Sequence, residues 1–252
     1  MNAFSQGRFH SSCGTGIESG NLEPSPVHSL SHRALINGVG GVLLLGVVFF
    51  LCVRIVSEPD CWFHMAFGRY VLEHGTLPPG DLFSHTGFGN EWISTGWASS
   101  VLLHGLHELV GPQGLVLLVF AVVAGAFGAL YVASVRLFGN RGSVVLLLLP
   151  LALGTYLRFS PRPEIFSLLC ITLEVLILVT ADSSPAAAAG KLPRRLWLLA
   201  PLMAIWANLH GGFVIGFAPL GLYGLHRLWL WARPRTADNF RWLLPCAAAS
   251  LA

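Results

Sequence analysis

Long apolar runs separated by short polar segments make up most of the chain. A run of about 20 apolar residues is long enough to cross a bilayer, and it does so as a helix because lipid cannot hydrogen-bond with the backbone. The sequence predicts six membrane spans and the first half of a seventh, at residues 34–53, 115–135, 143–157, 165–180, 196–209, 213–231 and 242–252. We therefore predict an all-α, polytopic transmembrane helix bundle that is incomplete at its C-terminus.

The composition agrees with that pattern. Hydrophobic residues make up 54% of the 252 residues and charged residues only 11%, which excludes an ordinary soluble domain. Residues 1–33 are rich in Ser, Gly, His and Pro and have no apolar period. We predict that they form a disordered cytoplasmic tail, and that residues 34–252 form the transmembrane module.

Arginine and lysine residues are distributed unevenly between the two sides of the predicted spans. With the N-terminus in the cytoplasm, the cytoplasmic connections contain Arg136, Arg141, Lys191, Arg194, Arg195, Arg233, Arg235 and Arg241. The opposite side contains Arg54, Arg69, Arg158 and Arg162. Positive residues favour the cytoplasmic side of a membrane, so the sequence predicts this orientation. The lipid bilayer is the expected partner, and no nucleic acid is expected.

The first connection between spans, residues 54–113, is long and polar. Six of the chain's twelve acidic residues fall between Glu58 and Glu108, in a loop that the orientation makes extracytoplasmic. Residues 60–74 and 97–109 repeat apolar positions at helical spacing, and glycines follow both segments. We predict two short amphipathic helices on the membrane surface.

Three side chains of this loop are candidates for catalysis. Asp60 and His64 are four residues apart and would share one face of a helix, where Asp60 could act as a general base or ligate a divalent cation. Asp60 could equally cap the helix after Pro59, with His64 exposed beside it. Asp81 follows Pro-Pro-Gly, where an aspartate often satisfies turn amides, so a structural role competes with a catalytic one.

Two other outer connections carry candidate substrate-binding residues. Arg158 and Arg162 in one short turn could clamp a phosphate, since a guanidinium matches phosphate oxygens in a bidentate way. Snorkelling, or pairing of Arg162 with Glu164, would be the structural alternative. Asn208 and His210, which end the fifth predicted span, could bind hydroxyl groups or hydrogen-bond with neighbouring helices. Glu164, in the same turn as the two arginines, is a further substrate-binding candidate. The topology brings all these candidates to one membrane face, which suits an anionic, lipid-linked substrate.

These features resemble the GT-C class of integral-membrane glycosyltransferases, which use polyprenyl-phosphate sugars as donors. The resemblance covers residues 34–231, the N-terminal half of such an enzyme, and includes an aspartate soon after the first span and the stretches at residues 60–64, 81–86 and 206–212. It implies an enzyme of the bacterial plasma membrane. It also implies that Asp60, which matches the acidic residue of the first outer loop, serves as the base or as a metal ligand.

We therefore expect transfer of a sugar from a polyprenyl-phosphate donor to an acceptor at the extracytoplasmic face. Asp60 would activate the acceptor, Arg162 would neutralise the departing phosphate, and His64 and His210 would orient hydroxyl groups. Two alternatives stay open. One is a transporter or flippase for a lipid-linked or anionic solute, although Glu174 is the only candidate polar group predicted to lie deep in a span. The other is a non-catalytic membrane subunit.

Overall fold

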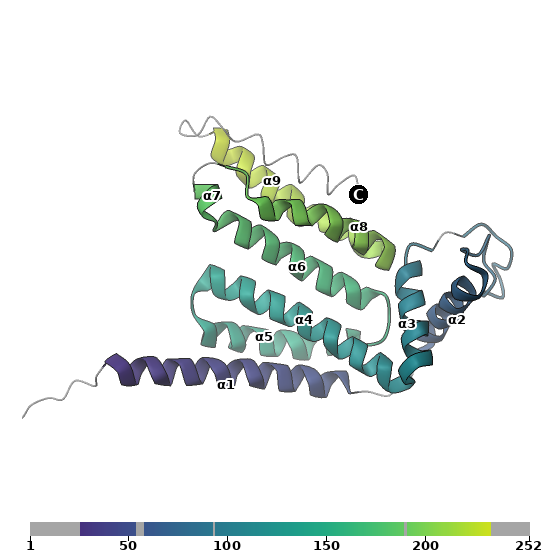
Figure 1. Cartoon of the computed structure of the whole chain (residues 1–252), viewed down its shortest axis with the longest axis horizontal. Helices are drawn as coiled ribbons and strands as arrows, with labels where there is room; N and C mark the ends of the chain where they lie inside the picture. Colours follow the sequence, from purple (N-terminus) through teal and green to yellow (C-terminus); the bar gives the residue numbers. More distant parts are fainter. Residues whose placement is uncertain (1–25, 54–57, 93, 189–190, 233–252) are drawn as a thin grey trace, which may run out of the picture.

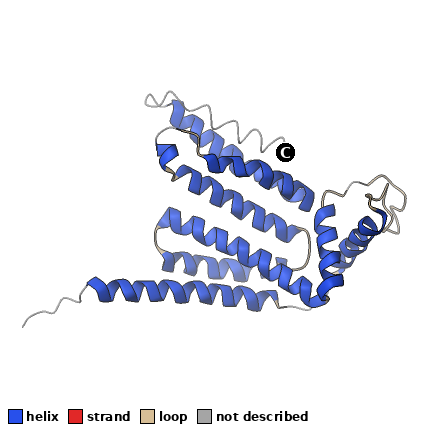
Figure 2. Cartoon of the chain, in the orientation of Figure 1, coloured by secondary structure: helices blue, strands red, loops and turns tan. Residues whose placement is uncertain are grey.

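The computed structural model describes residues 26–53, 58–92, 94–188 and 191–232 (Figure 1). Every regular element within those residues is helical (Figure 2). In the described part of the chain, four segments are long and apolar enough to cross a membrane: Pro112–Phe138, Arg141–Arg158, Glu164–Asp182 and Gly211–Leu230. The prediction of an all-α, multi-pass membrane protein is confirmed to that extent.

The helices follow the predicted order along the chain. They are α1 (Pro26–Cys52), α2 (Pro59–His74), α3 (Trp97–Val110), α4 (Pro112–Phe138), α5 (Arg141–Thr155), α6 (Glu164–Asp182), α7 (Pro185–Ala188), α8 (Leu199–Leu209) and α9 (Phe217–Ala232). Short 3-10 turns adjoin three of them: η1 (Tyr156–Arg158) follows α5, η2 (Arg194–Leu198) precedes α8, and η3 (Gly211–Gly216) precedes α9.

The apolar helices lie alongside one another, and α2 and α3 lie together at one end of them (Figure 1). The pair α4 and α6 has the most extensive contact among these apolar helices. One buried cluster joins α1, α4, α5 and α6 and includes Val48, Val123, Phe127 and Leu148. A second joins α6 to η2, α8 and α9 around Trp206. Large apolar side chains such as Leu146 and Leu222 remain exposed on the outer faces, as lipid-facing positions require.

The predictions for the N-terminal tail and for one span need correction, and the prediction for the last, partial span falls outside the described residues. Helix α1 begins at Pro26, so residues 26–33 are helical where the sequence favoured disorder; residues 1–25 lie outside the described residues. The predicted span at residues 196–209 is divided into η2 and α8, and the eleven residues of α8 extend only about 16 Å, half of a bilayer's apolar thickness. Residues 242–252 also lie outside the described residues.

The two helices predicted within the first connection are present as α2 and α3. Gly75 ends α2 in the left-handed conformation, with φ of 67°, and its N–H donates to the carbonyl of Val71. Gly68 lies where α2 crosses α3, and a Cβ atom there would overlap the carbonyl oxygen of Ser100. Glycine therefore permits the close approach of the two helices, and this crossing fixes where the first residues of α2 lie relative to α3.

Candidate functional site

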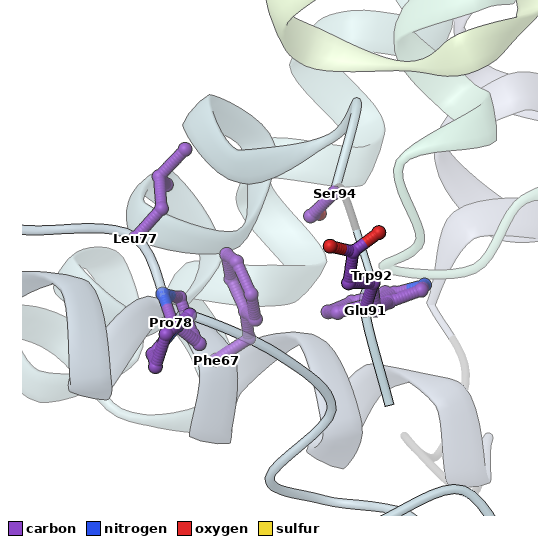
Figure 3. A pocket seen from close by; sticks show the side chains of 7 residues that line it. Phe67, Leu77, Pro78, Glu91, Trp92 and Ser94 are labelled. Atoms are coloured by element: carbon purple, nitrogen blue, oxygen red, sulfur yellow. The ribbon is translucent and has the colours of Figure 1, made fainter. Parts of the chain in front are cut away.

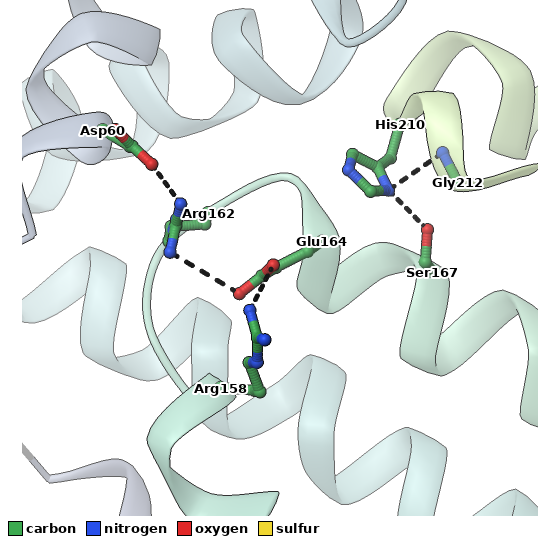
Figure 4. Close-up of polar contacts among 7 residues, drawn as sticks. All are labelled: Asp60, Arg158, Arg162, Glu164, Ser167, His210 and Gly212. Carbon is green, nitrogen blue, oxygen red and sulfur yellow. Dashed lines mark hydrogen bonds and ion pairs between the residues drawn. The ribbon is translucent and has the colours of Figure 1, made fainter.

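A cluster of ion pairs joins the start of α2 to the turn between η1 and α6. Arg162 donates to Oδ2 of Asp60, and its Nη1 lies 3.8 Å from Oε1 of Glu164. Arg158 donates from Nη1 to Oε2 of Glu164 at 3.3 Å (Figure 4). Asp60 and Arg162 are 102 residues apart in sequence, so the pair ties the outer helices to the apolar bundle.

Local sequence explains why Arg162 is held at this point. Phe159 is buried against Phe127 of α4, with ring centroids 6.0 Å apart, and it anchors the turn. Arg162 lies between two prolines, and each proline restricts the backbone of the residue before it. The Arg162 carbonyl accepts from the N–H of Ile165 at 3.2 Å, in the first turn of α6. The guanidinium therefore extends from a constrained backbone.

His210 is held by a chain of hydrogen bonds from two helices. Trp206 donates from Nε1 to Ser167 Oγ at 2.7 Å, and Ser167 lies 2.7 Å from His210 Nδ1. The backbone N–H of Gly212 also donates to Nδ1, at 3.1 Å. Since a backbone N–H can only donate, Nδ1 is an acceptor and the ring proton is on Nε2. His210 therefore presents an N–H donor on the edge away from Ser167 (Figure 4).

His64 has the opposite arrangement. Its Nδ1 lies 3.0 Å from Ser100 Oγ, and the Ser100 hydroxyl donates to the carbonyl of Gly96 at 3.1 Å. With its only proton donated, the Ser100 oxygen accepts from Nδ1–H of His64. Nε2 of His64 is then left as an acceptor. The site thus has one imidazole that can donate and one that can accept.

Some of these groups line a small open pocket, but Asp60 and Arg158 are not among its described lining residues. Its volume is about 240 Å³, and its lining consists of His64, Trp92, Ser94, Thr95, Gly96, Arg162, Pro163, Glu164 and His210. The pocket lies where α2, α3, the turn before α6 and the end of α8 meet. The guanidinium of Arg162, the carboxylate of Glu164 and the imidazoles of His64 and His210 thus line the same small pocket.

A larger and more apolar pocket adjoins the first (Figure 3). Its volume is about 590 Å³, and it is lined by Phe67, Leu77, Pro78, Pro79, Glu91, Trp92 and Ser94. Trp92 and Ser94 line both pockets. The Trp92 ring is held edge-to-face by Phe63 and Phe67, at centroid distances of 5.6 and 5.4 Å. Trp92 therefore separates a polar compartment from an apolar one.

Comparison of the chain with protein-family models, with curated proteins and with solved structures gives no match. The function of the site therefore has to be inferred from its geometry.

Two of the candidate residues from the sequence, Asp81 and Asn208, make hydrogen bonds that stabilise the fold. Asp81 accepts the N–H groups of Phe83 and Ser84 through Oδ1, at 3.0 and 2.9 Å, and the Ser84 hydroxyl through Oδ2. The hydrogen bond from the Ser84 side chain, with those from the two backbone groups, lowers the pKa of Asp81. Asn208 accepts from Trp97 Nε1 at 2.8 Å and donates to the carbonyl of Ala204. Neither residue is among the described residues that line the polar pocket.

Asp60, the candidate cation ligand, is paired with a guanidinium. Among the described residues, no group of three His, Cys, Asp or Glu side chains is placed to hold a metal ion. The carboxylates of Asp60 and Glu164 are both engaged by the Arg162 guanidinium. A cation at Asp60 would have to compete with that guanidinium, and the role of Asp60 as a metal ligand stays a prediction.

The sequence did not indicate the residues that position the two histidines. Ser100 and Ser167 are ordinary hydroxyl residues in mostly apolar helices, and no motif marks them. Only Ser167 could have been found from the sequence, because it follows Glu164 by three residues and so lies on the same face of the helix.

Glu174 lies two further turns along α6. It is fully buried, and neither carboxylate oxygen has a hydrogen-bond partner among the described residues.

Burial keeps both pocket histidines neutral near pH 7. Burial lowers the pKa of His64 below 6.5, and the charges of Arg162 and His210 lower it further, while Asp60 opposes the change. Burial also lowers the pKa of His210, opposed by Glu164. A histidine with a depressed folded-state pKa binds fewer protons than the unfolded chain does below pH 6.5. Its contribution to stability is complete above that pH and is lost as the pH falls towards the folded-state pKa.

We predict that the midpoint temperature of unfolding decreases as the pH is lowered from 7.5 to 5.5. Each of these two histidines adds a slope of up to about 1.4 kcal/mol per pH unit to the free energy of unfolding in this window. A His64→Gln/His210→Gln variant should show a flatter profile, whereas His74→Gln, at an exposed position of α2, should keep the parent slope. Equal slopes for parent and double variant would contradict the assignment.

Proposed function

We propose that the protein is a membrane glycosyltransferase of the GT-C type, which transfers a sugar from a polyprenyl-phosphate donor to an acceptor hydroxyl. The site would face the extracytoplasmic side of a bacterial plasma membrane, with the N-terminus in the cytoplasm. One observation carries this proposal: the Arg162 guanidinium lines a small polar pocket between two carboxylates and two neutral histidines, at the end of the apolar helices. In a bilayer crossed by these helices, the phosphate of a lipid-linked donor would lie near that end.

The proposed role of Arg162 is to bind the donor phosphate. A guanidinium forms parallel hydrogen bonds with phosphate oxygens as readily as with a carboxylate. The incoming phosphate would replace Asp60 on Arg162, while Glu164, which also pairs with Arg158, would keep the guanidinium in place. Donor binding thereby frees the Asp60 carboxylate beside the pocket, so that the base becomes available only when the donor is present.

The positions of these groups support the following reaction. The acceptor oxygen forms a bond with the anomeric carbon of the donor sugar as the bond from that carbon to the phosphate oxygen breaks. The electron pair leaves with the phosphate, whose growing negative charge is stabilised by Arg162. Asp60 takes the acceptor proton as general base. Nε2 of His64 accepts a hydrogen bond from a sugar or acceptor hydroxyl, and Nε2–H of His210 donates one.

Replacing Asp60 with Asn tests this proposal. The amide preserves the shape of the side chain but cannot take a proton, so we expect glycolipid formation in reconstituted membranes to decrease roughly 10²- to 10⁴-fold. Glu73→Gln is the matched control, because it removes a carboxylate from an exposed ion pair on the same helix, and it should leave turnover unchanged. Unchanged turnover in Asp60→Asn would rule out the proposed base.

Glu174 favours a second candidate function, transport or flipping of a lipid-linked or anionic solute. This carboxylic acid is fully buried in α6 without a hydrogen-bond partner among the described residues, and ionisable groups inside spans commonly belong to transport pathways. Proteoliposomes that contain the protein and no acceptor would separate the two functions. Solute accumulation that Glu174→Gln abolishes would support transport over transfer.

A further inference from the structure

Another pocket, with arginines in a largely apolar lining, lies at the opposite end of the apolar helices. Its volume is about 420 Å³, and its lining includes Arg136 from the last turn of α4, Arg194 and Arg195 from η2, and Ser184 after α6. Thr180, in the last turns of α6, also lines it. Thr180 follows Glu164 by sixteen residues within α6, so the two pockets are separated by about 24 Å along that helix.

The three arginines of this pocket have no anionic partner in the described part of the chain. Four other described arginines each pair with a carboxylate: Arg69, Arg158, Arg162 and Arg227. No such pair involves Arg136, Arg194 or Arg195, and the described lining of the pocket contains no acidic residue. The nearby Asp182 is engaged by Arg227 at 3.1 Å. The positive charge here is therefore not neutralised by the described residues.

A hydroxyl donor accompanies these guanidinium groups. The Ser184 oxygen accepts the N–H of Ala187 at 3.2 Å, and its own proton has no acceptor among the described residues. By contrast, the Ser183 hydroxyl donates to the carbonyl of Val179 at 2.8 Å. Guanidinium groups from two separate elements and one free hydroxyl thus face the same volume, which is the chemistry that binds a phosphate group.

Exposed apolar side chains directly follow these arginines in the sequence. Leu137 and Phe138 follow Arg136 at the end of α4, and they are 60% and 68% exposed. Trp197 and Leu198 follow Arg195 in η2, and they are 50% and 54% exposed. A free phosphate ion would gain nothing from these neighbours, whereas a phospholipid would place its acyl chains against them. Tryptophan is also typical of the interface between headgroups and acyl chains.

We propose that this pocket binds the phosphate headgroup of an anionic phospholipid in the leaflet opposite the glycosyltransferase site. Basic pockets between helices at a membrane surface bind such headgroups because several cations then neutralise one lipid. In the orientation that the sequence predicts, this leaflet is the cytoplasmic one. The lipid would link the end of α4 to η2, and so to the start of α8. The site depends on none of the residues assigned to sugar transfer.

Thermal unfolding of the full-length protein in neutral detergent tests this proposal. Tryptophan fluorescence would be followed with phosphatidylglycerol, with phosphatidylcholine at the same mole fraction, or with inorganic phosphate. A single site near saturation should raise the midpoint by roughly 5 °C with phosphatidylglycerol over phosphatidylcholine. The variant Arg136→Gln/Arg194→Gln/Arg195→Gln should lose that difference, and Arg162→Gln, in the other pocket, should retain it.

Arg141→Gln is the matched control. Arg141, at the start of α5, is also exposed and has no carboxylate partner among the described residues, but it does not line the pocket, and its variant should respond as the parent does. If the triple variant does not fold, each single substitution should still reduce the difference. A retained response in the variants, an equal response to the two lipids, or a full response to inorganic phosphate alone would overturn the proposal.

Discussion

Replacing Gly68 with Ala should strongly destabilise the outer part of the protein, although it adds only one methyl group. The added Cβ would overlap the backbone carbonyl oxygen of Ser100, and a backbone atom cannot move aside as a side-chain tip can. Overpacking of a tight contact costs about 1–3 kcal/mol, and a backbone clash belongs at the upper end of that range. Helix α2 would have to move away from α3.

That movement has a consequence for the pocket. His64 lies one turn before Gly68 and is held by Ser100, so separation of the helices should break the hydrogen bond that positions the imidazole. Urea unfolding and limited proteolysis between α2 and α3 would measure the effect. Gly105→Ala is the control, since a Cβ at this glycine of α3 would meet nothing within 4 Å and Ala is the better helix former. Equal stability of the two variants would contradict a close crossing of α2 and α3 at Gly68.

Replacing Arg162 with Lys should reduce sugar transfer about 100-fold while changing stability little. Loss of a group that stabilises charge in a transition state typically costs 10²- to 10³-fold in turnover. The lysine ammonium group retains the positive charge. It lacks the planar fork of N–H donors with which a guanidinium can contact Glu164 and a phosphate at the same time. The side chains of Arg162 and Asp60 are 29% and 54% exposed, so solvent screening limits the stability change to about 1 kcal/mol or less.

Arg69→Lys provides the comparison for this prediction. Arg69 also pairs with a carboxylate, Glu73, but the pair is exposed on α2 and lies outside the pocket. Its variant should transfer sugar at the parent rate. Measurement of turnover beside the unfolding midpoint separates a catalytic effect from a folding effect. Full turnover in Arg162→Lys would show that phosphate binding in this pocket does not require the guanidinium geometry of Arg162.

The sequence predicted the helical architecture well, because the length of each apolar run and the glycines that end helices are local features of the sequence. Gly75 and Gly111 end α2 and α3 at the expected places, and the apolar runs correspond to the long helices. The failure at residues 196–209 also has a physical cause. The run has helical hydropathy, but it begins with a 3-10 turn after Pro193, which shortens the α-helix to Leu199–Leu209. Hydropathy does not report that change of backbone.

The candidate site was predictable only in part. Membrane topology brought Asp60, Arg162 and His210 to one face in the prediction. In the structure Arg162 and His210 line one pocket, and Asp60 pairs with Arg162 but is not in that lining. The ion pair itself depends on the packing of α2 against the turn before α6, which no local pattern encodes. For Asp81 and Asn208 the sequence left a structural alternative open, and their hydrogen bonds agree with that alternative.

Binding of a polyprenyl monophosphate to the purified protein tests most directly whether the polar pocket receives the donor phosphate. We predict saturable binding that Arg162→Gln weakens by roughly 30-fold or more, since lost charge-assisted hydrogen bonds of about 2 kcal/mol correspond to that factor. Arg69→Gln should bind as the parent does. Unchanged affinity in Arg162→Gln would contradict the proposed role of this pocket.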